Sequence, residues 1–156
     1  SIGMKVGRIA KAFGMNINYF SVRNYKKTQF LKFLSSLDYL SVHCPLNEKT
    51  KDLITIKELK IMKKNMILIN TARGGIVNEN DLTKALKQKI IAGAGIDVTT
   101  SEPPKKSHAY YSILNEANFI WTPHTAWASN ETLQEAINQL IKNINSFYKG
   151  KKRNIV

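Results

Sequence analysis

A chain of 156 residues, 43% of them hydrophobic, has the size of one globular domain and can bury a core of its own. Its single cysteine excludes an intramolecular disulfide, and the lack of a long apolar run or a basic-then-apolar leader predicts a cytoplasmic protein without a membrane span. The net charge of +13 comes mainly from lysines spread along the whole chain, which favours a solvated basic surface over a nucleic-acid site.

Hydrophobic periodicity predicts helices and strands that alternate along the chain. In chain order we expect helix 3–13, strand 17–20, helix 30–37, strand 38–43, a short helix from 55, strand 66–70, helix 78–89, strands 93–98 and 119–121, and helix 129–150. A capping box at Thr55 opens the short helix, and Ser129 caps the last one. The continuous apolar run 66–70 is typical of a strand covered on both faces. This alternation predicts an α/β fold with a doubly wound parallel sheet.

Polar residues follow four successive strands of this predicted sheet. They are His43, then Arg73 between small residues and glycines, then Asp97 with Glu102, and finally His124. Because ligands of a doubly wound sheet bind at the carboxyl ends of its strands, we expect these side chains to form one site.

The chemistry of this set points to proton transfer. Arg73 can clamp a carboxylate with its planar guanidinium group, and His124 is a general acid or base that a carboxylate such as Glu102 would orient. No serine or cysteine nucleophile motif accompanies them, so proton transfer coupled to cofactor chemistry, such as hydride transfer to a 2-keto acid, is favoured over nucleophilic catalysis.

Each of these residues also has a purely structural interpretation. An arginine after a strand is usually a surface ion pair, a Glu-Pro step a turn, and a histidine after proline a loop residue; only their joint occurrence at successive strand ends favours a site. His43 either caps its strand or lines a cofactor crevice. His108 is interpreted as structural or solvated, and Cys44 as a packed small residue rather than a nucleophile.

Four segments resemble the successive signatures of the D-isomer-specific 2-hydroxyacid dehydrogenases. They are "LSVHCPLNEKT", "MKKNMILINTARGGIVNENDLTKAL", "IAGAGIDVTTSEPP" and "WTPHTAWAS", and they occur in family order over nearly the whole chain. The resemblance implies a Rossmann-like NAD(P)-binding domain and a hydride transfer from NAD(P)H to the keto carbon of a small 2-keto acid.

The resemblance also implies a role for individual residues. Arg73 corresponds to the family's substrate-carboxylate arginine, His124 to its general acid/base, and Glu102 to the glutamate that supports this histidine. The implied cofactor contacts are Ser1, Ile2 and Gly3 at the end of the phosphate loop, Cys44, Pro45 and Thr50 in the cofactor groove, and Thr71, Ala72, Asp97 and His124 at the nicotinamide. His43, which precedes Cys44, is a further candidate for cofactor binding.

Two features bear on specificity. Trp127 in "TPHTAWAS" is similar to the glycerate dehydrogenase or hydroxypyruvate reductase branch, which favours hydroxypyruvate, although an aromatic side chain packed at a domain hinge would look the same. Ser21 stands where NAD-specific members have an acid, and Arg23 follows two residues later, so we expect NADPH to be accepted at least as well as NADH.

The resemblance further implies that the chain lacks parts of the family's fold. "SIG" matches only the end of the phosphate loop, so the preceding central strand and the substrate-binding domain are expected to be absent, with residues 1–128 as a truncated cofactor domain and 129–156 as a C-terminal helix and tail. Family members suggest a homodimer, or pairing with a complementing N-terminal segment. A catalytically inactive dinucleotide-binding or partner-binding module is the alternative, against which the presence of Arg73, Glu102 and His124 argues.

Overall fold

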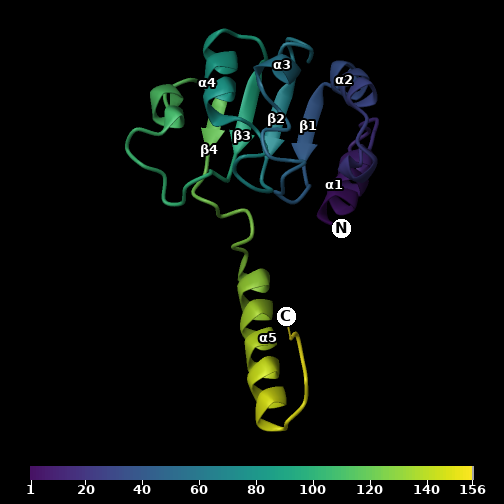
Figure 1. The fold of residues 1–156 in the computed structure, drawn as a ribbon, viewed down its shortest axis with the longest axis vertical. Helices are drawn as coiled ribbons and strands as arrows, with labels where there is room; N and C mark the ends of the chain where they lie inside the picture. The colour runs from purple at the N-terminus through teal and green to yellow at the C-terminus, as the bar shows by residue number, and fades with distance from the viewer. Residues whose placement is uncertain (156) are drawn as a thin grey trace. The chain divides into compact units, whose positions relative to one another are not determined.

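Four parallel strands form the sheet of this protein in a computed structural model that describes residues 1–155. The strands are β1 (Tyr39–Val42), β2 (Ile67–Asn70), β3 (Gly93–Ile96) and β4 (Phe119–Trp121), in the spatial order β1-β2-β3-β4 (Figure 1). The helices are α1 (Ile2–Ala12), α2 (Lys27–Ser36), α3 (Ile56–Leu59), α4 (Glu79–Lys87) and α5 (Asn130–Tyr148), with 3-10 turns η1 (Val22–Asn24) and η2 (Ala109–Ile113). The predicted α/β class with a parallel sheet is confirmed.

The helices begin where their capping residues predict. Thr55 accepts a hydrogen bond from the Lys57 amide, and the Glu58 carboxylate accepts the Thr55 amide at 3.0 Å, which completes the capping box of α3. The Ser129 hydroxyl accepts the Thr132 amide at 3.2 Å and starts α5. Local side-chain chemistry therefore determines these helix ends.

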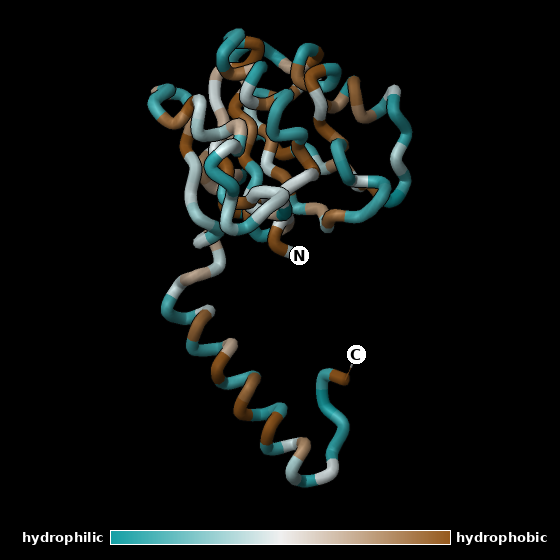
Figure 2. Tube along the Cα trace, turned by 60° about the vertical axis from the view of Figure 1, so that its left-hand side comes forward, coloured by the Kyte–Doolittle hydropathy of each residue, from teal (hydrophilic) through white to brown (hydrophobic). Residues whose placement is uncertain are grey.

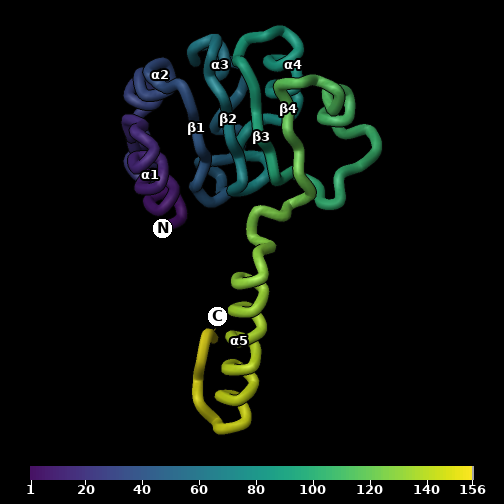
Figure 3. Tube along the Cα trace, turned by 180° about the vertical axis from the view of Figure 1, so that it is seen from behind, coloured from purple at the N-terminus to yellow at the C-terminus, as the bar shows by residue number. Residues whose placement is uncertain are grey.

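The core lies on one face of the sheet. Leu40, Leu68, Ala94 and Phe119 stand side by side across the four strands and are buried. The helices α3 and α4 lie in front of the sheet in Figure 1, and Figure 3 shows the strands from behind. Residues of α3, α4, α2 and η2 join the strands in one hydrophobic cluster.

The opposite face of the sheet is more open than the sequence predicts. Ile67 and Ile69 of β2 stay half-buried, and Ile120 of β4 is 67% exposed. The expectation that segment 66–70 is covered on both faces is therefore wrong for this chain, because the helices packed on the sheet cover mainly the other face.

The predicted strand over 17–20 does not form. These residues have no strand partner among residues 1–155, and no strand pairs with the outer edge of β1. A strand needs a neighbouring strand for its backbone hydrogen bonds, and none of the described strands lies beside these residues. Phe20 is held instead by its side chain, with its ring centroid 5.1 Å from that of Phe30 and 5.2 Å from that of Phe33.

The chain divides into two compact units, Ser1–Pro123 and the residues from His124 onward. The second unit consists largely of α5, whose apolar residues recur along one side of the helix (Figure 2). These residues are 40% to 81% exposed: Leu133, Ile137, Leu140, Ile144 and Phe147. Within residues 1–155, no helix combines the length and the apolar character needed to cross a membrane.

Candidate active site

A tight turn after β2 presents Arg73. The buried carboxamide of Asn70 accepts the Ala72 amide at 3.0 Å and donates to the Arg73 carbonyl at 3.0 Å, so one side chain holds both ends of the turn. The Arg73 side chain is exposed, and its guanidinium donates to the Ala72 carbonyl at 2.7 Å. Sequence reasoning missed Asn70, although an asparagine directly after an apolar strand is a signal for such a turn.

A second turn, after β3, presents Glu102. The Thr99 amide donates to Glu102 Oε1 at 3.0 Å, and the Thr99 hydroxyl donates to the Ser101 carbonyl at 2.9 Å. A Cβ added to Gly74 would overlap the backbone of Thr99, so the turn of Arg73 and the turn of Glu102 touch at this point. The structure therefore brings these two predicted site segments together.

Asp97 connects the carboxyl ends of β2, β3 and β4. Its amide donates to the Asn70 carbonyl at 3.0 Å, and its buried carboxylate accepts a hydrogen bond from the Thr122 hydroxyl. The Thr122 amide in turn donates to the Ile96 carbonyl at 3.0 Å. Thr122 was not predicted as a site residue, because its role depends on the pairing of β3 with β4.

His124 and Trp127 belong to the second unit. The backbone of His124 has a φ of 53°, in the left-handed region that few residues other than glycine adopt. Such a conformation is frequent at functional positions. The Trp127 side chain is 52% exposed.

The predicted cofactor-groove residues follow β1. The fully buried Thr50 donates its hydroxyl to the Pro45 carbonyl at 2.6 Å and thereby holds the loop after the strand. His43 Nε2 lies 2.8 Å from the Ser41 hydroxyl, and burial lowers the pKa of the His43 imidazole. Burial also raises the pKa of the Cys44 thiol, which agrees with a packed residue rather than a nucleophile.

The N-terminus of α1 lies beside the end of β1. A Cβ added to Gly3 would be 3.2 Å from the Cβ of His43, so the first helical turn and the strand end approach closely. No side-chain hydrogen bond caps this helix at Ser1, and its first turn has no acidic residue. Backbone amides at such a helix end suit the pyrophosphate of a dinucleotide. In the 3-10 turn η1, the Ser21 hydroxyl accepts the Arg23 amide at 3.4 Å.

His108 has a structural role, as interpreted from the sequence. Its Nε2 lies 2.8 Å from Glu79 Oε2, its Nδ1 accepts the Tyr110 amide at 3.3 Å, and its ring stacks on Trp121 with centroids 5.5 Å apart. The side chain is only 9% exposed.

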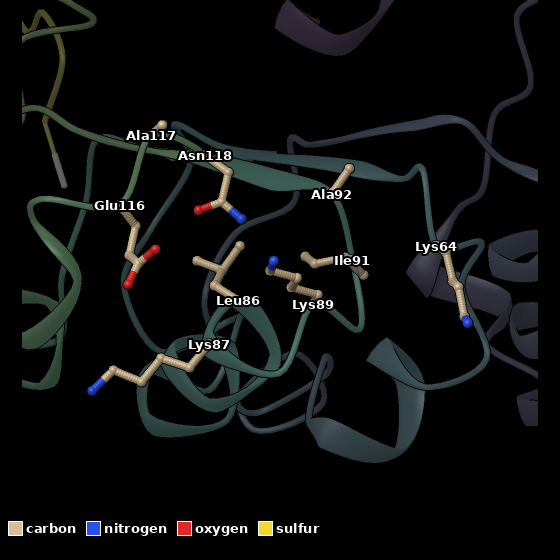
Figure 4. A pocket seen from close by; sticks show the side chains of 9 residues that line it. All are labelled: Lys64, Leu86, Lys87, Lys89, Ile91, Ala92, Glu116, Ala117 and Asn118. Carbon is tan, nitrogen blue, oxygen red and sulfur yellow. The ribbon is translucent and has the colours of Figure 1, made fainter.

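A cavity of about 400 Å³ lies elsewhere, at the amino ends of β3 and β4 (Figure 4). Ala92 and Asn118, which precede these strands, line it together with Lys64 and Lys87, whose ammonium groups point away from its centre. The candidate site residues follow the strands at the opposite edge, so this cavity is separate from the site.

The segment 1–126 matches the family described as "D-isomer specific 2-hydroxyacid dehydrogenase, NAD binding domain". The chain belongs to this family. This confirms the resemblance, and the family's NAD-binding character agrees with the helix N-terminus beside β1. Of the predicted catalytic residues, Arg73 and Glu102 lie in the first unit, and His124 lies in the second.

Relatives within the family are dehydrogenases and reductases. A glycerate dehydrogenase of Methylorubrum extorquens is 42% identical, over 100% of this chain and 50% of the relative. A hydroxypyruvate reductase of Blautia hydrogenotrophica is 31% identical, over 99% of this chain and 50% of the relative. The chain thus spans about half the length of the curated relatives it matches.

The fold agrees with that of a solved family member. The NAD-complexed D-isomer specific 2-hydroxyacid dehydrogenase of Lactobacillus delbrueckii ssp. bulgaricus aligns with a TM-score of 0.87 at 30% sequence identity. The alignment covers 99% of this chain and 53% of the other.

Proposed function

We propose that this chain is the NAD(P)-binding portion of a dehydrogenase that transfers a hydride between NAD(P)H and a small 2-keto acid. Hydroxypyruvate, reduced to D-glycerate, is the favoured substrate, because a glycerate dehydrogenase is 42% identical over the whole chain and Trp127 matches that branch. The observation that carries the proposal is the contact at Gly74 between the turns of Arg73 and Glu102, at the strand ends of a family cofactor domain.

Each side chain then has a definite task. The exposed Arg73 guanidinium binds the substrate carboxylate through paired hydrogen bonds. His124 gives a proton to the carbonyl oxygen during reduction and takes it back during oxidation, while Glu102 orients the imidazole and stabilises its protonated form. The nicotinamide supplies or receives the hydride when bound.

The described residues fit a dinucleotide. The N-terminus of α1 would hold the pyrophosphate with its backbone amides, and His43, Cys44 and Pro45 would line the cofactor groove in a loop that the buried Thr50 holds. Thr71, Ala72 and Asp97 would line the nicotinamide. Ser21 and Arg23 favour NADPH at least as much as NADH, since no carboxylate at Ser21 repels a 2′-phosphate.

The proposal extends to the compartment, the division of the chain and its partners. We infer a cytoplasmic protein in which residues 1–128 form the cofactor domain. We also infer that residues 129–156 return to a substrate-binding region, because the apolar side of α5 is exposed. A homodimer or a complementing N-terminal segment would cover such surfaces. The competing function is a catalytically inactive dinucleotide-binding or partner-binding module, against which the presence of Arg73, Glu102 and His124 argues.

Thermal unfolding with NADPH, with NADH and without ligand tests the cofactor assignment. Saturation at 100 times the dissociation constant should stabilise the fold by about 2.7 kcal/mol, whereas absence of any shift would contradict it. Consumption of NADPH with hydroxypyruvate then separates the two candidate functions, because an inactive module binds the dinucleotide without turnover. The Arg73→Gln variant is the control: it should lose turnover and keep the dinucleotide-induced shift.

A further inference from the structure

Glu79, the first residue of α4, accepts three hydrogen bonds from distant parts of the chain. The Thr100 amide donates to Oε1 at 2.7 Å, the Thr100 hydroxyl donates to Oε2 at 2.8 Å, and His108 Nε2 lies 2.8 Å from Oε2. The side chains of Glu79 and His108 are 11% and 9% exposed. This carboxylate is therefore a largely buried acceptor that joins Thr100 and His108 to α4, and not a surface charge.

The hydrogen bonds of Glu79 fix the turn that presents Glu102. Thr100 follows Thr99, whose amide donates to Glu102 Oε1 at 3.0 Å. Anchoring Thr100 on Glu79 thus holds the backbone segment on which the Glu102 carboxylate rests. His108 anchors the other end of the same loop, six residues after Glu102, to the same carboxylate.

The same residue is tied to the turn that presents Arg73. Glu79 follows Arg73 by six residues along the chain, and its helix begins where the Asn78 side chain accepts the Asp81 amide at 3.1 Å. Gly74, between Arg73 and Glu79, touches the backbone of Thr99 and Thr100. The two turns are thus joined at two points, one a backbone contact and the other the Glu79 carboxylate.

Stabilisation of the first turn of α4 does not by itself account for the contacts of Glu79. A glutamate in the first turn is favoured by the helix dipole even when it is exposed. Asp81 supplies a second acid to the same turn, and it accepts the Ile56 amide at 2.9 Å. Of these two acids, Glu79 contacts the loop that carries Glu102 and Asp81 contacts Ile56.

We propose that Glu79 is a positioning residue that holds the Glu102 turn in register with the Arg73 turn. This inference rests on the proposed function, in which Arg73 binds the substrate and Glu102 orients the acid/base. A carboxylate offers acceptors to all three donors, whereas a glutamine at this position has one acceptor oxygen and an amide that faces the donors. Loosening the turn by about 1 Å would reduce turnover by up to about 100-fold.

The matched pair Glu79→Gln and Glu58→Gln tests this role. Glu58 also accepts a threonine amide and hydroxyl, those of Thr55 at 3.0 and 2.6 Å, but it lies in α3. We expect Glu79→Gln to lower kcat for keto-acid reduction at least tenfold while the Kd for the dinucleotide changes less than twofold. Glu58→Gln should leave both values within twofold of the unchanged protein.

Hydrogen exchange gives a readout that does not depend on turnover. In Glu79→Gln the amides of Thr99 and Thr100 should exchange at least tenfold faster, and in Glu58→Gln they should not. A second pair covers the case in which Glu79→Gln does not fold: His108→Gln keeps a donor and should retain kcat, whereas His108→Leu should lower it.

The outcomes distinguish a failure of the positioning role of Glu79 from a failure of the proposed function. Equal kcat in Glu79→Gln and Glu58→Gln, or unchanged exchange at Thr99 and Thr100, would overturn the positioning role while leaving the proposed function in place. An unchanged protein that binds dinucleotide but reduces no keto acid would overturn the proposed function and, with it, the positioning of a catalytic pair. Faster exchange together with a selective loss of kcat supports both.

Discussion

The backbone of Gly74 lies directly against the backbone of Thr99. A Cβ at Gly74 would overlap the Thr99 carbonyl group and the Thr100 nitrogen, which belong to backbone and cannot rotate away. The close approach of the two turns therefore requires glycine at this position.

The first prediction concerns this contact. Gly74→Ala should destabilise the fold by about 1–3 kcal/mol, because the two backbones must separate to accept the methyl group. Gly95→Ala is the control, since nothing lies within 4 Å of its added Cβ. Urea unfolding of both variants checks the difference, and equal stability would contradict the close packing.

Thr50 offers a test of how the loop after β1 is held. Its fully buried hydroxyl donates to the Pro45 carbonyl at 2.6 Å, so Thr50→Val should cost about 1–3 kcal/mol by leaving that carbonyl without this donor. Thr50→Ser retains the hydroxyl and should lose less. Denaturant midpoints at constant slope give the values, and a valine variant as stable as the serine variant would contradict the assignment.

His43 should make stability depend on pH. Burial lowers the pKa of its imidazole, so the folded protein binds the proton less readily than the unfolded chain. Above the ordinary value of about 6.5 both states are neutral and stability is at its full value. As the pH falls below this value, the unfolded state takes up the proton first, and stability decreases until the folded pKa is reached.

Urea unfolding of His43→Asn at pH 7 and pH 5 measures this contribution. The variant should lose less stability between the two pH values than the unchanged protein does. An identical loss in both proteins would show that other groups cause the pH dependence.

Cys44 provides a chemical probe of the proposed cofactor groove. Because burial raises the pKa of its thiol and the side chain is half-buried, alkylation by iodoacetamide at pH 8 should be several-fold slower in the folded protein than in urea. Saturating NADPH should slow it further if Cys44 lines the groove. A rate that NADPH does not change would place the dinucleotide elsewhere.

Cofactor preference can be changed at Ser21. A carboxylate there would repel a 2′-phosphate and accept hydrogen bonds from the ribose hydroxyls, so Ser21→Asp should increase the Kd for NADPH relative to that for NADH by about tenfold or more. Arg23→Gln should weaken NADPH binding alone. Calorimetric titration of each variant measures both affinities, and a strong NADH preference in the unchanged protein would refute the assignment.

The sequence by itself determined the elements whose signals are local. The capping box at Thr55 and the cap at Ser129 mark helix starts because a single side chain pairs with amides two or three residues away. The apolar runs of β2 and β4 and the polar residues at their ends follow from the alternation of strands and helices. The same alternation predicts that Arg73, Glu102 and His124 follow strands, and the family signatures imply the role of each residue.

Only the tertiary structure decided the features that need a partner distant in sequence. Residues 17–20 have strand composition, but no neighbouring strand pairs with them, so composition alone gave the wrong element. Glu79 and His108 are separated by 29 positions, and their hydrogen bond exists only because the loop after β3 folds back onto α4. Backbone pairing and buried side-chain contacts depend on what the rest of the fold brings near, and residue type does not encode that proximity.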